Sequence, residues 1–207
     1  MEFANLGALK EHVQDLTPLQ ASKACLDMYH GLQYLHRKGY IHRDMKLENI
    51  LLVGDLNSGF TAKIADFGLS RIVATIMTSL IGTPSYMAPE LAQELEYNYK
   101  VDVYSSTIIV FEVFTKQKFP FPMDLIPMQQ LQAIRRSDKP QIPSFIPCTL
   151  QTLIVKGWSK EPRERPEVDE FIDLFEELIE SNHKAIYPKN SEGWTPHSGR
   201  LRGVKRR

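Results

Sequence analysis

Apolar and polar residues repeat along this chain with spacings that predict several helices and one pair of short strands. Residues 18–38 carry apolar side chains at helical spacing, and Gly39 follows where a helix commonly ends. The stripe consists of Leu19, Leu26, Tyr29, Leu32 and Leu35. A mostly apolar run at 101–116 predicts a buried central helix. Three amphipathic helices are expected after it, at 125–136, 150–158 and 168–179.

Two β-prone runs, 50–53 and 62–64, are separated by turn-forming residues 54–59 and predict a small hairpin. Residues 66–90 show little periodicity and predict one long loop, which in a compact domain is expected when the loop is functional. The pattern as a whole predicts an α+β fold that is mainly helical and carries a minimal sheet.

Length and composition favour one domain of ordinary size, because 207 residues at 43% hydrophobic content can bury one sizeable core. Charge is uneven, since residues 184–207 contain seven Lys or Arg and one Glu, a net charge of +6. This segment is predicted to be a disordered basic tail. Cys25 and Cys148 lie far apart and outside any CxxC spacing, so we expect two buried free thiols and no zinc site.

The longest apolar stretch, 107–114, is interrupted by Glu112 and is too short to cross a membrane. We therefore expect no membrane partner and a cytoplasmic location. The basic tail leaves nuclear import, an acidic partner or RNA open. A nucleic-acid partner is disfavoured, because Tyr187 and Trp194 are too few to form a stacking platform.

Three short motifs carry the chemistry: His-Arg-Asp-Met-Lys-Leu-Glu-Asn at 42–49, Asp-Phe-Gly at 66–68 and Ala-Pro-Glu at 88–90. In order and spacing they resemble the catalytic loop, the magnesium loop and the end of the activation segment of a eukaryotic protein kinase. The resemblance implies a protein-kinase-like fold, with residues 1–183 as the C-terminal lobe from the hinge onward and 184–207 as the tail.

Phosphoryl transfer explains these residue types. It needs a carboxylate near the substrate hydroxyl, hard oxygen ligands for magnesium, and cations near the transferred group. The resemblance assigns these roles to Asp44 as catalytic base, Asn49 and Asp66 as Mg²⁺ ligands, and Lys46 as the cation at the γ-phosphate of ATP. A lone Asp more often caps a turn or a helix, but the combined motif outweighs that interpretation.

Lys46 and Thr83 resemble residues of serine/threonine kinases, in which the threonine bridges the catalytic Asp and Lys. The Met-Ala-Pro-Glu ending at 87–90 is also common in the tyrosine-kinase-like group. The expected substrate is therefore a protein serine or threonine, and dual specificity stays open.

Other matches have structural roles in the family. His42 and Phe67 resemble members of the regulatory spine, Gly68 completes the Asp-Phe-Gly motif, and Asp102 resembles the residue that anchors the spine to the central helix. Glu90 and Arg165 resemble a buried ion pair. Thr107 stands where the family often has glycine, and a helix interior tolerates it.

Arg43 suggests an activation segment that phosphate can order, because guanidinium binds phosphate through two hydrogen bonds. An upstream kinase would act on this segment. The candidate acceptors are Thr75, Thr78 and Ser79.

Residues 1–5 resemble the kinase hinge, in which the backbone of Glu2 and Ala4 would bind the adenine edge of ATP while Leu51 forms the floor beneath it. The sequence contains no glycine-rich GxGxxG loop and no lysine of the VAIK type. We therefore expect the N-terminal lobe to be absent and this chain alone to transfer phosphate weakly or not at all. A start at an internal methionine is the simplest explanation. The alternatives are a pseudokinase-like binding module and a fragment that cannot fold alone.

Overall fold

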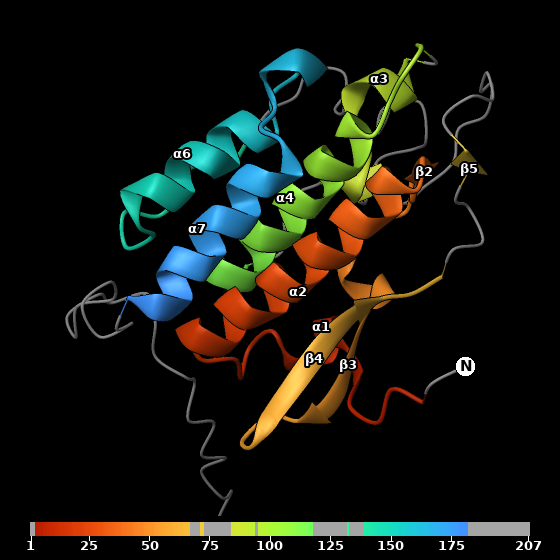
Figure 1. The fold of residues 1–207 in the computed structure, drawn as a ribbon. Coiled ribbons are helices and arrows are strands. Elements are labelled where there is room, and N and C mark those ends of the chain that lie inside the picture. The colour runs from red at the N-terminus through yellow and green to blue at the C-terminus, as the bar shows by residue number, and fades with distance from the viewer. Residues whose placement is uncertain are drawn as a thin grey trace, which may run out of the picture.

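The computed structural model describes residues 3–66, 71–72, 84–93, 95–117, 132 and 139–181. In this part of the chain the long helices lie side by side and a β-hairpin lies at one side of them (Figure 1). The helices are α1 (Leu9–His12), α2 (Pro18–Arg37), α3 (Pro89–Ala92), α4 (Lys100–Thr115), α6 (Cys148–Gly157) and α7 (Val168–Glu180). Short 3₁₀ turns are η1 (Leu47–Asn49), η3 (Pro84–Tyr86) and η4 (Pro162–Glu164). The strands are β1 (Gly7–Ala8), β2 (Tyr40–Ile41), β3 (Ile50–Asp55), β4 (Gly59–Ile64) and β5 (Arg71–Ile72). The mainly helical fold with a small sheet is the predicted one.

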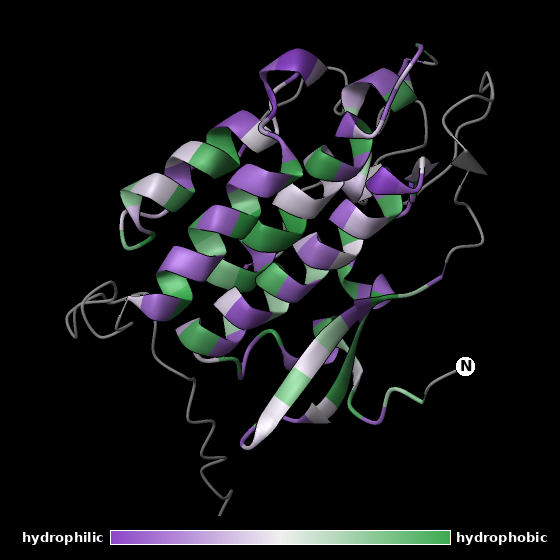
Figure 2. Cartoon of the chain, in the orientation of Figure 1, coloured by the Kyte–Doolittle hydropathy of each residue, from purple (hydrophilic) through white to green (hydrophobic). Residues whose placement is uncertain are grey.

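Helix α2 begins and ends at strong local signals. Thr17 and Gln20 form a capping box, Pro18 is the first helical residue, and Gly39 takes a φ of +78° just beyond the end. The buried face packs against α7 and β4. Figure 2 shows hydrophilic and hydrophobic bands on both α2 and α7, as expected for helices with one exposed face.

Helix α4 is buried along its whole length and forms the centre of the core. Aromatic rings join the surrounding helices to each other: Tyr29 of α2 stacks on Phe171 of α7 at 4.4 Å between ring centroids. Phe111 of α4 lies 5.6 Å from Trp158, which follows α6. These contacts make α2, α4, α6 and α7 one packed unit.

The hairpin is antiparallel, with Ile50 opposite Ile64 and Asp55 opposite Gly59, and β1 pairs with the outer side of β3. Gly54 takes a φ of +121°, and a Cβ there would lie 2.6 Å from the carbonyl oxygen of Gly59. Asn5 extends the sheet with its side chain, because its amide donates to Gly54 O at 2.8 Å and accepts from Gly54 N at 2.9 Å. The predicted hairpin is confirmed, with strands longer than expected.

Some predictions differ from the structure. Cys148 is exposed at the first turn of α6, so the expectation of two buried thiols holds for Cys25 alone. Residues 66–90 are not one uninterrupted loop, since they include β5, η3 and the start of α3. The helix predicted at 125–136 and the tail at 184–207 lie almost entirely or entirely outside the described residues. In the described part, no helix is both long and apolar enough to cross a membrane.

Candidate active site

The loop from His42 to Lys46 is anchored on a carboxylate of the central helix. Asp102 of α4 is fully buried, and its two oxygens accept hydrogen bonds from the backbone N–H groups of His42 and Arg43, both at 2.8 Å. The Nε2 atom of His36, on α2, lies 2.9 Å from Asp102 Oδ2 and forms a third hydrogen bond. A buried carboxylate needs such partners, and in satisfying them it fixes the loop to the core.

Two residues of the motifs have left-handed backbone conformations. Arg43 has a φ of +69° and Asp66 a φ of +59°. Such conformations are uncommon outside glycine, cost free energy, and concentrate at functional sites where the surrounding structure enforces them. The Asp102 hydrogen bond to Arg43 N is one enforcing contact in this site.

Asp44, Lys46 and Asn49 form a compact group at the end of this loop. The Asp44 carboxylate is buried, and its Oδ2 accepts from Lys46 Nζ at 2.6 Å and from Asn49 Nδ2 at 3.1 Å. The same Asn49 nitrogen donates to the backbone oxygen of Asp44 at 2.8 Å. These bonds turn the amide nitrogen of Asn49 toward Asp44 and leave the amide oxygen to face other ligands.

The hairpin brings Asp66 next to this group. Ala65 N donates to Asn49 O at 2.8 Å, and Ala65 O lies 3.0 Å from His42 Nε2, so the residue before Asp66 is bound on both sides to the catalytic-loop motif. Asn49 and Asp66 offer an amide oxygen and a carboxylate, which fit Mg²⁺ because that ion takes few protein ligands and completes its shell with phosphate and water. Clusters of three or more His, Cys, Asp or Glu suited to a metal do not occur in the described part.

The predicted adenine contacts are partly described. Ala4 O accepts from Gly7 N at 3.1 Å in a turn. Leu51 is half-buried on β3, opposite Ala8 of β1. Glu2 lies outside the described residues, as do Phe67 and Gly68.

The ion pair implied for Glu90 and Arg165 is present and buried. The guanidinium donates to both carboxylate oxygens, at 2.5 Å from Nη1 and 2.8 Å from Nη2. It also donates to Lys100 O and Ser159 O, each at 2.9 Å. This pair ties α3, which follows the activation segment, to the start of α4 and to the turn after α6.

A second buried carboxylate of α4, Glu112, holds the segment just before α3, and no motif in the sequence indicates this role. Tyr86 donates its hydroxyl to Glu112 Oε2 at 2.5 Å, and Tyr86 O accepts from Ser105 Oγ at 2.7 Å. Burial, together with the charge of Glu112, raises the pKa of Tyr86 and keeps the hydroxyl protonated as the donor. The signal was the single charge inside the apolar run 107–114.

Another unpredicted pair lies at the edge of the catalytic loop. Lys10 of α1 donates to Glu48 Oε1 at 2.6 Å. Partial burial opposes ionisation of Glu48, but the hydrogen bond and charge of Lys10 outweigh it, so the pKa of Glu48 is lowered and that of Lys10 is raised. No motif predicted this contact, because the partners are 38 positions apart.

The activation-segment candidates Thr75, Thr78, Ser79 and Thr83 lie outside the described residues. Arg43, which is predicted to bind the phosphate, is a buried residue and directly precedes Asp44 in the sequence. The strand β5 within the same segment pairs with β2 just before the catalytic loop, with Ile41 opposite Arg71.

Comparison with known proteins agrees with this geometry. A family model described as "Protein kinase domain" matches residues 1–175. The chain is 34% identical over 191 residues to mitogen-activated protein kinase kinase kinase 7 of Homo sapiens, a match that covers 86% of this chain and 30% of that protein. It is 34% identical over 170 residues to the probable serine/threonine-protein kinase gdt4 of Dictyostelium discoideum, covering 79% of this chain and 10% of that one.

A third relative, the RGS domain-containing serine/threonine-protein kinase A of Dictyostelium discoideum, is 32% identical over 183 residues, covering 86% of this chain and 16% of that protein. The chain therefore spans about a third or less of the length of these curated relatives.

Proposed function

Because this chain belongs to the protein kinase family, we propose that it supplies the catalytic loop of a serine/threonine kinase that transfers the γ-phosphate of ATP to protein hydroxyls. The observation that carries the proposal is the position of Asp44. Its buried carboxylate lies in a loop fixed to the core by Asp102 and receives hydrogen bonds from Lys46 and Asn49.

Each group has a proposed task. Asp44 accepts the proton of the substrate hydroxyl, and the hydrogen bonds from Lys46 and Asn49 hold its carboxylate in one orientation. Lys46 also places a positive charge where the transferred phosphate gains negative charge. Magnesium held by Asn49 and Asp66 would neutralise the triphosphate, and the hinge at Ala4 with Leu51 would hold adenine.

Serine or threonine is the proposed acceptor, supported by Lys46 and by relatives whose names describe serine/threonine kinases. We also propose that an upstream kinase phosphorylates the activation segment and that Arg43 binds the phosphate. The partners of the proposed enzyme are then ATP, a protein substrate and this activating kinase.

The test is a transfer assay with γ-labelled ATP, Mg²⁺ and a degenerate mixture of Ser, Thr and Tyr peptides, followed by phosphoamino-acid analysis. We expect weak transfer, with the label on serine and threonine, because the sequence contains no glycine-rich GxGxxG loop and no lysine of the VAIK type. Replacing the proposed base by Asp44→Asn should lower the rate by about 100-fold or more, because base catalysis contributes on that scale. Removing Mg²⁺ with a chelator should abolish transfer.

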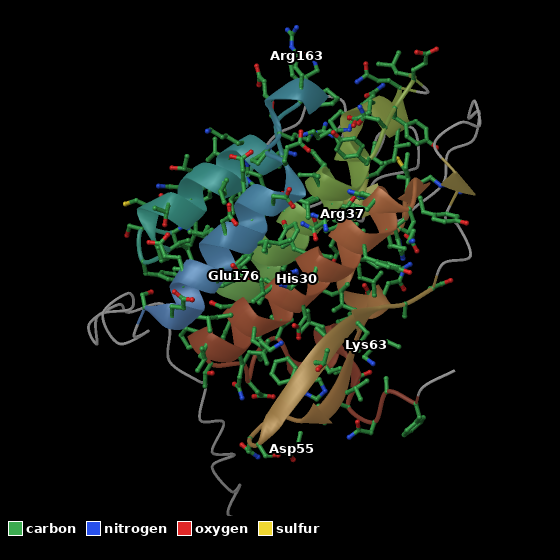
Figure 3. The ribbon with its side chains drawn as sticks, viewed as in Figure 1. His30, Arg37, Asp55, Lys63, Arg163 and Glu176 are labelled. Atoms are coloured by element: carbon green, nitrogen blue, oxygen red, sulfur yellow. The ribbon has the colours of Figure 1, made fainter. Side chains whose placement is uncertain are left out.

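Asp55→Asn is the matched control, because Asp55 lies at the tip of the hairpin and carries the same chemical change far from the loop (Figure 3). Its rate should stay at the level of the unchanged protein. Full activity in Asp44→Asn would refute the assignment. Folded protein that binds no Mg²⁺–ATP and transfers no phosphate would favour the pseudokinase-like binding module instead.

A further inference from the structure

A cavity of about 600 Å³ lies along α6, away from the catalytic loop. On one side it is lined by one face of α6 and the turn that follows, and on the other by the segment that contains Lys139 and Ile142. The lining residues are Lys139, Pro140, Ile142, Gln151, Val155, Trp158, Ser159 and Lys160. Figure 1 places α6 on the opposite side of the molecule from the β3–β4 hairpin. The cavity is therefore separate from the proposed phosphoryl-transfer site.

The floor of this cavity is apolar and open to solvent. Val155, on the outward face of α6, is 57% exposed. Trp158 and Ile142 lie beside it in the same cavity. A volume of this size with mostly apolar lining is typical of binding sites that take a side chain or a small ligand.

The charged residues that the structure describes along the cavity wall are both basic. Of the described residues that line it, the charged ones are Lys139 and Lys160, and none is acidic. The Lys139 ammonium is held in place, because it lies 4.3 Å from the ring centroid of Tyr104 and 5.8 Å from that of Trp158, and it hydrogen-bonds the Tyr104 hydroxyl. A cation fixed in this way loses little conformational entropy when it meets an anion.

The wall next to Lys160 is also rigid. Ser159 O accepts from Arg165 Nε at 2.9 Å, and Arg165 is held by the buried pair with Glu90. The guanidinium carbon of Arg165 lies 5.0 Å from the centroid of the Tyr104 ring, the ring that Lys139 also contacts. The cavity is thus built on fixed elements and is formed before any partner arrives.

We propose that this cavity, the α6 cavity, is a docking site for an acidic peptide segment of a partner protein, which inserts one bulky apolar side chain over Val155 and places carboxylates near Lys139 and Lys160. The occupant follows from complementarity of apolar surface and charge. The basic segment 184–207 of this same chain has the wrong sign for the site, with seven Lys or Arg against one Glu. The proposal does not depend on phosphoryl transfer.

The test selects random dodecapeptides on phage against the full chain and then measures binding of the recovered peptides by fluorescence anisotropy. We expect sequences with an aromatic or large aliphatic residue flanked by Asp or Glu, with affinity that weakens as salt rises. Lys139 packs on two rings, so the variants are Lys160→Glu and Val155→Glu at exposed positions. Each should weaken binding about tenfold or more.

Lys63→Glu is the control, since Lys63 is an exposed lysine on β4, labelled in Figure 3 at the opposite side of the molecule. It should bind as the unchanged chain does. Recovery of basic peptides, or binding that neither cavity variant weakens, would overturn the proposal. So would a dimer of this chain that is seen by sedimentation and that Val155→Glu dissociates. Catalytic activity does not enter the readout, so an inactive kinase would leave this test intact.

Discussion

The contact between α6 and α4 makes a quantitative prediction about one glycine. A Cβ added at Gly157 would lie 2.2 Å from Thr107 Oγ1, 2.9 Å from Thr107 Cγ2 and 3.0 Å from Phe171 Cζ. Ordinary contacts begin near 3.4 Å, so either α6 or Thr107 must move by roughly 1 Å. Overpacking of this kind costs about 1–3 kcal/mol, while replacing Gly by Ala in a helix returns about 0.5–1 kcal/mol. Gly157→Ala should therefore lower the free energy of unfolding by about 1–2 kcal/mol.

The double variant isolates the cause. Thr107→Ala alone removes a methyl group and a hydroxyl that donates to Val103 O at 2.7 Å, which should cost about 1–2 kcal/mol. In Thr107→Ala/Gly157→Ala the two clashing atoms of Thr107 are gone, so the new methyl can move into the space they leave and away from Phe171 Cζ. The double variant should then be about as stable as Thr107→Ala alone, with a coupling of about 1–2 kcal/mol.

The assay is urea unfolding followed by far-ultraviolet circular dichroism, with equal m-values required before the free energies are compared. An exposed change on the same helix, Lys156→Ala, is the control and should stay within about 0.5 kcal/mol of the unchanged chain. If the two substitutions prove additive within about 0.5 kcal/mol, the steric argument is wrong, because independent sites behave in that way.

Further predictions concern buried or paired charges. Glu90→Gln or Arg165→Leu should each cost about 3–5 kcal/mol in urea unfolding, because each strands a buried partner; costs below about 1 kcal/mol would contradict this. In an NMR titration the Glu48 carboxyl should ionise below its ordinary pKa of 4.5, so its contribution to stability is present above that pH and is lost as pH falls through the lowered value. Lys10→Met should raise the pKa of the Glu48 carboxyl back toward its ordinary value. A Glu48 pKa that is the same in the variant and in the unchanged chain would disprove the pairing. Asp102→Asn should speed hydrogen exchange of the backbone N–H groups of His42 and Arg43 by about tenfold or more, because one of them would then face the amide nitrogen of Asn, which is a donor. Unchanged protection of both groups would exclude the anchoring role.

The sequence was sufficient for the elements whose local signals agree with their tertiary setting. The helix α2 was predicted from its apolar stripe, with Gly39 beyond its end, and it runs from Pro18 to Arg37. The two β-prone runs and the turn between them predict the hairpin, but its strands extend into the predicted turn, where Gly54 pairs with Phe60 and Asp55 with Gly59.

Several features of the site depended on long-range contacts and could not be predicted. His36 and Asp102 are 66 positions apart, and nothing in a single sequence shows that this imidazole will form a hydrogen bond to that carboxylate. The exposure of Cys148 was mispredicted because cysteine is usually buried, whereas this residue stands at the first turn of a helix that begins at the surface.

The polar residues of α4 explain how a fully buried helix can also organise a surface site. Asp102 holds the loop that begins at His42, Ser105 and Glu112 hold Tyr86, and Lys100 O accepts from the guanidinium of Arg165. A buried acid would be costly alone, so each one requires a partner, and here the partners come from the segments that carry the proposed chemistry. Thr107 instead meets α6. Separate contacts of one helix thus serve the site and the core, and for this reason Gly157→Ala should reduce the folded population while leaving the Asp102 hydrogen bonds of the folded molecules intact.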